Sequence, residues 1–264
     1  MIDAHTHLYS EKYRHDMEQV IQRGREQLEA VVVSAVDSDS LAKSLDIQRR
    51  HPDFIHVTAG IHPNKAAGLT VEDRRNLWEN IDRVRHRIIA VGEVGPDFHH
   101  TRDPRSRRRQ LDLLDEALNK AQAWNLPLVV HARRAEAAAL EVLSRSRIPV
   151  MFHCFAGSKP MAAKIAAHGF YLSFSAILLF NAELQEAVTT IPCELILTET
   201  DSPALSPRQG HPRNEPAYLE TIVWRLAKLL NDTPQKTAQI TAANARRFYG
   251  LSNHKLPVDL APKN

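Results

Sequence analysis

The chain has 264 residues, of which 43% are hydrophobic and 25% charged, so it can bury a full globular core. It contains no apolar run of about 18 residues, and its N-terminus resembles no export signal, so we expect a cytoplasmic protein without membrane contact. The two cysteines, Cys154 and Cys193, are too few for a disulfide framework. The net charge of +3 is too small to indicate an acidic partner by itself, and nothing predicts an obligate protein partner.

Short apolar runs alternate with amphipathic stretches along the chain. Eight runs predict strands, at residues 1–4, 30–34, 54–59, 88–91, 128–130, 150–152, 171–175 and 195–197. Helical patterns cover 11–27, 37–51, 71–86, 104–124, 135–145, 216–230 and 234–249.

Parallel strands joined by helices predict a (β/α)₈ TIM barrel, because a parallel strand needs a helical crossover to return. A doubly wound open sheet is the structural alternative. We expect a single domain over residues 1–250, followed by a loosely packed tail at 251–264.

Polar residues with metal-binding side chains follow five of the predicted strands. Asp3, His5 and His7 alternate along the first strand, which places them on one face. The complete ligand set is His5, His7, Glu93, His131, His153 and Asp201. In a closed barrel the carboxyl ends of the strands converge on one mouth, whereas an open sheet would spread these residues along an edge.

Four imidazoles and two carboxylates exceed the needs of one tetrahedral ion with an open position. They suffice for two divalent ions if one carboxylate bridges them, and such a pair activates water for hydrolysis. Mixed imidazole and carboxylate ligands suit Zn²⁺ or Mn²⁺, and Mg²⁺ completed by substrate oxygens is the alternative.

The successive motifs resemble those of the TatD family of metal-dependent deoxyribonucleases, within the amidohydrolase superfamily. They span most of the chain in family order, at residues 1–8, 60–63, 92–97, 131–133, 153–158, 199–203 and 213–216. The resemblance implies that His5, His7, Glu93 and Asp201 hold one metal and that Glu93, His131 and His153 hold the second. Glu93 then bridges the ions, and Asp201 is the catalytic base.

Two departures from the family pattern concern substrate preference. The stretch Gly95-Pro96-Asp97-Phe98 stands where the family usually has Gly-Leu-Asp-Tyr, so the loop is stiffer and lacks a phenol. The helix that follows keeps Gln110 but has Ala117 where a second glutamine is common. Neither change affects a ligand.

Several further residues are candidates for substrate binding. His62 follows the third strand and could contact substrate or the attacking water. Arg133 has the strand parity of His131, and its guanidinium suits a phosphate. Arg213 could also bind phosphate or could pair with Glu215. His99 and His100 are interpreted as solvated loop residues.

The arginine-rich stretch 102–109 decides between two functions. Cations near a helix N-terminus oppose the helix dipole, so we expect Arg107 and Arg108 to contact a phosphate backbone, with a solvated helix start as the alternative. This favours a phosphodiesterase acting on DNA, expected to be single-stranded, over a hydrolase of a small amide, ester or lactone with the same metal centre.

Overall fold

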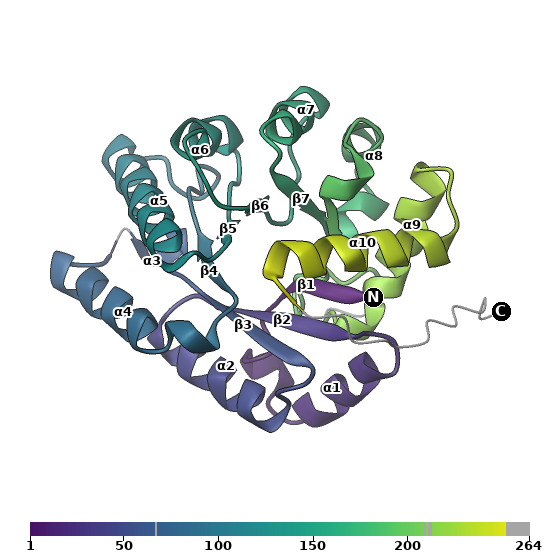
Figure 1. The fold of residues 1–264 in the computed structure, drawn as a ribbon, viewed down its shortest axis with the longest axis horizontal. Coiled ribbons are helices and arrows are strands. Elements are labelled where there is room, and N and C mark those ends of the chain that lie inside the picture. The colour runs from purple at the N-terminus through teal and green to yellow at the C-terminus, as the bar shows by residue number, and fades with distance from the viewer. Residues whose placement is uncertain (67, 209, 211–212, 252–264) are drawn as a thin grey trace.

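Eight parallel strands in sequential order form the sheet of the computed structural model, which describes residues 1–66, 68–208, 210 and 213–251 (Figure 1). They are β1 (Ile2–Thr6), β2 (Ala30–Ala35), β3 (Ile55–Ala59), β4 (Ala90–Val94), β5 (Leu128–Val130), β6 (Val150–Phe152), β7 (Tyr171–Phe174) and β8 (Ile196–Thr198). The chain after β8 returns to β1, where Asp201 N–H donates to His5 O at 3.0 Å and His7 N–H donates to Ser202 O at 2.7 Å. The ring is thereby closed, which confirms the TIM barrel and excludes the open sheet.

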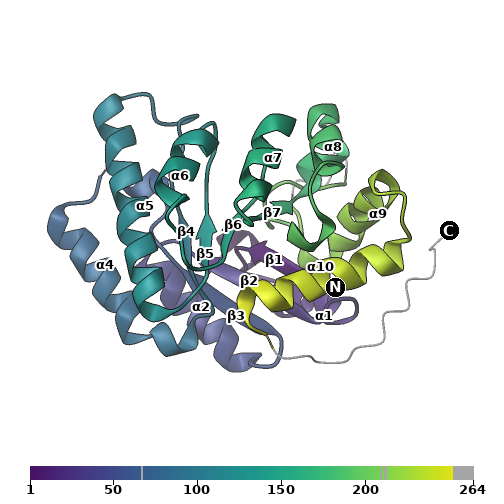
Figure 2. The same cartoon turned by 45° about the horizontal axis from the view of Figure 1, so that its top comes forward.

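Helices surround the barrel on the outside (Figures 1 and 2). They are α1 (Met17–Arg25), α2 (Ser38–Arg50), α3 (Pro63–Ala66), α4 (Val71–Arg83), α5 (Pro104–Trp124), α6 (Glu136–Leu143), α7 (Lys159–Ala167), α8 (Ala182–Val188), α9 (Leu219–Leu229) and α10 (Pro234–Tyr249). No helix among the described residues is long and apolar enough to cross a membrane.

Several predicted element boundaries need correction. The stretch 216–230 divides into a 3₁₀ turn, η5 (Pro216–Tyr218), and α9. The stretch 11–27 is a 3₁₀ turn, η1 (Glu11–Tyr13), followed by α1, because Asp16 between them has a non-helical backbone. The stretch 71–86 ends as a helix at Arg83, since Val84 leaves the helical conformation. The fourth strand runs to Val94, so Glu93 lies inside the strand and not after it. The predicted tail, apart from Leu251, lies outside the described residues.

Helix α10 packs across the end of the barrel where the strands begin. Ala242, Ala245, Phe248 and Tyr249 share one hydrophobic cluster with Ile2, Ala30, Ala90 and Tyr171, which stand at or near strand starts. The Tyr249 hydroxyl donates to Ala4 O at 2.8 Å. This packing leaves the opposite end, where the strands finish, as the place for a site.

Candidate metal centre

The six predicted ligands meet at the carboxyl end of the barrel. His5 and Glu93 lie inside β1 and β4, whereas His131 and His153 directly follow β5 and β6. Asp201 lies three residues beyond β8 with a left-handed backbone (φ 52°), which turns its side chain back towards β1. Strands far apart in the sequence thus bring their ligands to one point.

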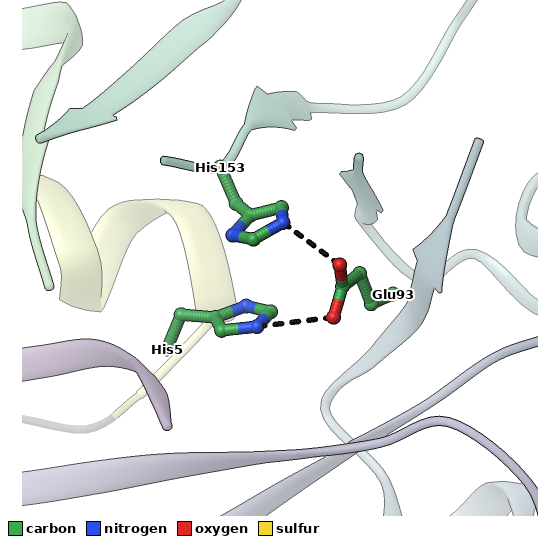
Figure 3. A group of neighbouring side chains, drawn as sticks. All are labelled: His5, Glu93 and His153. Carbon is green, nitrogen blue, oxygen red and sulfur yellow. Dashed lines mark hydrogen bonds and ion pairs between the residues drawn. The ribbon is translucent and has the colours of Figure 1, made fainter. Parts of the chain in front are cut away.

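Glu93 lies between two groups of imidazoles, one at each carboxylate oxygen. Its Oε2 atom is 3.3 Å from His5 Nε2 and 3.7 Å from His7 Nε2. Its Oε1 atom is 2.8 Å from His131 Nδ1, 2.9 Å from His153 Nε2 and 3.2 Å from His62 Nε2. Figure 3 shows His5 and His153 reaching different oxygens of this carboxylate. Such an arrangement is what a bridging ligand requires.

The spacing of the donor atoms fits metal coordination. His7 Nε2 lies 3.3 Å from both His5 Nε2 and Asp201 Oδ1, and His131 Nδ1 lies 3.3 Å from His153 Nε2. Ligands placed tetrahedrally at 2.0–2.1 Å from one ion are about 3.4 Å apart. In addition, Glu93 Oε2 is buried without a hydrogen-bond partner among the described residues, which a cation would supply.

The nitrogen of each ligand imidazole that faces away from the centre has a polar neighbour. His5 Nδ1 is 3.0 Å from Ser34 Oγ, and His7 Nδ1 is 3.1 Å from the Ser34 carbonyl oxygen. His131 Nε2 is 3.2 Å from Asp97 Oδ2, and His153 Nδ1 is 3.3 Å from Glu199 Oε1. Partners of this kind fix the tautomer and ring orientation of metal-binding histidines.

The electrostatics favour charged carboxylates around at least one neutral imidazole. Burial opposes ionisation of Glu93, but His153 and His62 hold its pKa well below the usual value. Burial likewise opposes ionisation of Asp201, and the hydrogen bond with His7 nevertheless lowers its pKa. Burial is the main cause that lowers the pKa of His5. Burial opposes the charged form of His153, but Glu93 and Glu199 raise its pKa well above the usual value, so a cation that binds there must displace a proton.

A cavity of about 650 Å³ opens above the centre. His62 and Arg133, both predicted to bind substrate, line it together with His7, Glu93, His131, His153 and Asp201. Lys65, His99 and Arg134 also line it, although no motif or spacing in the sequence singled them out for substrate binding. His99 lies on a turn and is partly exposed, as expected for a loop residue, and it also faces the cavity. His100 is exposed, and its Nδ1 atom lies 2.8 Å from Asp97 Oδ2.

The other predicted substrate-binding arginines have partners within the chain. Arg107 donates from Nε to Thr101 O at 2.8 Å and lies over the Phe98 ring, so the fold itself uses this cation in spite of the helix dipole. Arg108 pairs with Asp112 at 2.8 Å. Arg213 binds Asp16 at 2.6 Å and Glu215 at 2.8 Å, which agrees with the alternative of a structural pair. These three residues are not part of the cavity lining.

Two acidic residues of the centre were quoted in motifs without being given a role. Asp97 is buried and contacts both His131 and His100. Its backbone N–H donates to Gln110 Oε1 at 3.0 Å, so the glutamine retained from the family pattern positions this loop. Glu199 is buried behind His153 and accepts a hydrogen bond from the Ser173 hydroxyl. Asp97 and Glu199 each lie in the same short motif as a predicted metal ligand, Glu93 and Asp201 respectively. This proximity in the sequence was the signal that could have identified both carboxylates.

A sequence model of the TatD-related DNase family matches residues 2–250. The chain belongs to this family. It is 32% identical to an uncharacterised metal-dependent hydrolase of Bacillus subtilis, covering 96% of this chain and 100% of the relative. It is 31% identical to the 3′–5′ ssDNA/RNA exonuclease TatD of Erwinia tasmaniensis, covering 95% and 100% of the two chains. Membership in the TatD family confirms the predicted metal-dependent hydrolase of the deoxyribonuclease type.

A solved structure supports the fold independently. The TatD homologue of Escherichia coli superposes with a TM-score of 0.86 at 24% identity, covering 96% of this chain and 98% of that one. At this identity the likeness concerns the fold alone. It confirms the TIM barrel.

Proposed function

We propose that this TatD family member is a dinuclear nuclease that cleaves phosphodiester bonds of single-stranded DNA. The observation that carries the proposal is Glu93, whose two oxygens each face a separate group of imidazoles. His5, His7 and Asp201 would hold one divalent ion with Oε2, and His131 and His153 would hold the second with Oε1. When bound, two such ions lower the pKa of a water and stabilise the attacking and leaving oxygens.

Asp201 is placed to act as the general base. Its side chain is 18% exposed, whereas that of Glu93 is 2% exposed, so Asp201 can reach a water in the cavity. Its lowered pKa keeps the carboxylate free to accept a proton. Glu93 would serve as a bridging ligand and not as a base, because both of its oxygens are directed into the centre.

The charge of the mouth supports a phosphodiester substrate over a small amide, ester or lactone. Arg133 and Arg134 are exposed at the cavity, and no carboxylate of the described residues forms an ion pair with either, in contrast to Arg108 and Arg213. A guanidinium fork binds phosphate oxygens in a bidentate manner. We assign Arg133 to the phosphate that is cleaved and His62, which faces Glu93, to the oxygens around it.

The names of relatives agree with this substrate class, since the Erwinia tasmaniensis relative is called a 3′–5′ ssDNA/RNA exonuclease and a human relative at 27% identity is called a deoxyribonuclease. The test uses end-labelled single-stranded DNA, duplex DNA and RNA, and a panel of small esters and amides. Metal-depleted protein and protein reloaded with Zn²⁺, Mn²⁺ or Mg²⁺ are assayed in parallel. We expect metal-dependent cleavage of single-stranded DNA. Hydrolysis of an ester or amide without any cleavage of DNA would contradict the proposal.

A further inference from the structure

The mouth of the barrel has two chemically different rims. The basic rim, defined as Lys65, His99, Arg133 and Arg134, lies on helix α3, which follows β3, and on the loops after β4 and β5. The apolar rim, defined as Ile177, Phe180 and Leu205, lies on the segments after β7 and β8. Because the strands follow one another around the ring, these two groups of loops lie on opposite sides of the metal centre.

Two of the three residues of the apolar rim line the cavity, and the third follows one of them closely in the chain. Ile177 and Leu205 line the cavity itself. Ile177 belongs to the 3₁₀ turn η3 (Ala176–Leu179), and Phe180 N–H donates to its carbonyl at 3.1 Å. Phe180 is the residue that ends this turn, so its backbone is held beside the cavity residue Ile177.

The apolar rim exposes large hydrophobic side chains, which are rare on the surface of the described residues. Phe180 is 69% exposed and Leu205 is 37% exposed, and they are two of only four large hydrophobic side chains exposed among the described residues. Leu205 also has a left-handed backbone (φ 53°), which a branched residue adopts at a cost. The fold itself gains little from apolar side chains in these positions. A ligand that covers them would account for their placement.

The ligand must carry negative charge on one side and a flat apolar face on the other. Cations on the basic rim select an anionic backbone, and the metal centre between the rims selects the bond to be cleaved. A nucleotide in a single strand has both properties, since its base is free to leave the stack and lie against a side chain. A base paired inside a duplex has no accessible face.

We propose that the apolar rim is the stacking platform for the nucleobase next to the cleaved phosphate, with Phe180 as its main contact. The proposal rests on the proposed nuclease function. It adds a subsite at which the protein binds a nucleobase of the substrate as well as its phosphate backbone. Stacking uses the face of the ring, so the platform accepts each of the four bases. It discriminates against a backbone that has no base.

The test compares Phe180→Ala with wild type on two single-stranded substrates of equal length, natural DNA and an oligomer of abasic sugar phosphates. On natural DNA we expect Phe180→Ala to lower kcat/KM by about 5- to 150-fold, the range that corresponds to stacking of one base. On the abasic oligomer, wild type and variant should agree within about twofold. Phe180→Tyr, which keeps a ring, should restore most of the activity on natural DNA.

Because Phe180 is 69% exposed, its replacement should leave folding intact, and Trp224→Ala provides a matched control. Trp224 is an exposed aromatic residue on α9, outside the cavity lining, so its removal should leave both substrates unaffected. An unchanged rate of Phe180→Ala on natural DNA, or an equal loss on both substrates, would overturn the platform while the nuclease function stands. Absence of metal-dependent cleavage by the wild type would overturn the nuclease function and the platform together.

Discussion

Glu93 is the residue on which both halves of the centre depend. Its oxygens face His5 and His7 on one side and His131 and His153 on the other. We therefore expect wild-type protein supplemented with metal to contain about two ions per chain, and Glu93→Ala to lose most of both, because one carboxylate serves two sites. Elemental analysis of the purified proteins measures this directly.

The matched control for that variant is Glu136→Ala. Glu136 also lines the cavity, but it belongs to none of the groups of side chains that could hold an ion. It should retain the wild-type metal content. Full occupancy in Glu93→Ala would exclude the bridging role.

Asp201 combines a ligand position with access to the cavity. Asp201→Asn keeps an oxygen that can coordinate but removes the group that accepts a proton. A positioned general base contributes about 10²- to 10⁴-fold, so kcat on single-stranded DNA should fall at least 100-fold while KM changes little. Steady-state kinetics together with the metal content separates this effect from loss of the ion. A variant that keeps a third of the wild-type rate would remove Asp201 from the proton transfer.

At the scale of elements, the ligands are held in place by the close approach of β4 and β5. Gly95 has φ +143°, and a Cβ atom there would lie 2.1 Å from the carbonyl oxygen of His131. Gly95→Ala should therefore push the ligand His131 away from Glu93. We expect a loss of about 1–3 kcal/mol in the free energy of unfolding, as for other overpacked sites, together with reduced metal content.

Gly24→Ala is the control for Gly95→Ala, measured by urea unfolding of both proteins. Gly24 lies in α1, and its added Cβ would meet Phe54 at an ordinary distance of 3.5 Å. Alanine also favours a helix by about 0.5–1 kcal/mol, so this variant should be as stable as wild type or more so. If Gly95→Ala and wild type had the same free energy of unfolding, the segments after β4 and β5 would be able to move apart without loss of stability.

The elements that could be predicted accurately are those with local signals at both ends. The stretches 104–124 and 234–249 are α5 and α10 with the predicted bounds, because Asp103 and Thr233 accept N-cap hydrogen bonds and a left-handed residue ends each helix. The short helices α7 and α8 were not delimited, because nine and seven residues carry too little periodicity.

The same distinction holds for the site at the scale of the whole molecule. The meeting of the six candidate metal ligands could be predicted because they stand at or near strand ends, which the barrel brings together. The cavity residues Lys65, His99 and Arg134 could not be predicted. Lys65 lies on the four-residue helix α3, and the other two lie on loops whose course depends on backbone conformations such as the left-handed Arg134 (φ 55°). For Arg107 the dipole argument considered only the helix and missed the loop carbonyls that this side chain binds.

Because the whole chain has a net charge of only +3, attraction of nucleic acid depends on where the charges lie. The fixed cations of the cavity lining are Arg133, Arg134 and Lys65, of which Lys65 also pairs with Asp37 at 3.4 Å. If each contacts one phosphate, the logarithm of the binding constant for single-stranded DNA should fall with the logarithm of salt concentration with a slope of about −2. Arg134→Ser should weaken binding and flatten that slope by about 0.7, with metal content unchanged.

Arg145→Ser is the matched control for the salt series, because it removes the same charge from the opposite end of the barrel. Arg145 lies between α6 and β6, where strands begin, and it pairs with Asp115. Fluorescence anisotropy of labelled DNA over a range of salt concentrations, with Ca²⁺ in place of a catalytic metal, gives both slopes. If binding followed the charge of the whole molecule, the two variants would lose affinity equally. A loss of affinity confined to Arg134→Ser would show that the positive charges at the cavity, and not the net charge of the protein, attract single-stranded DNA.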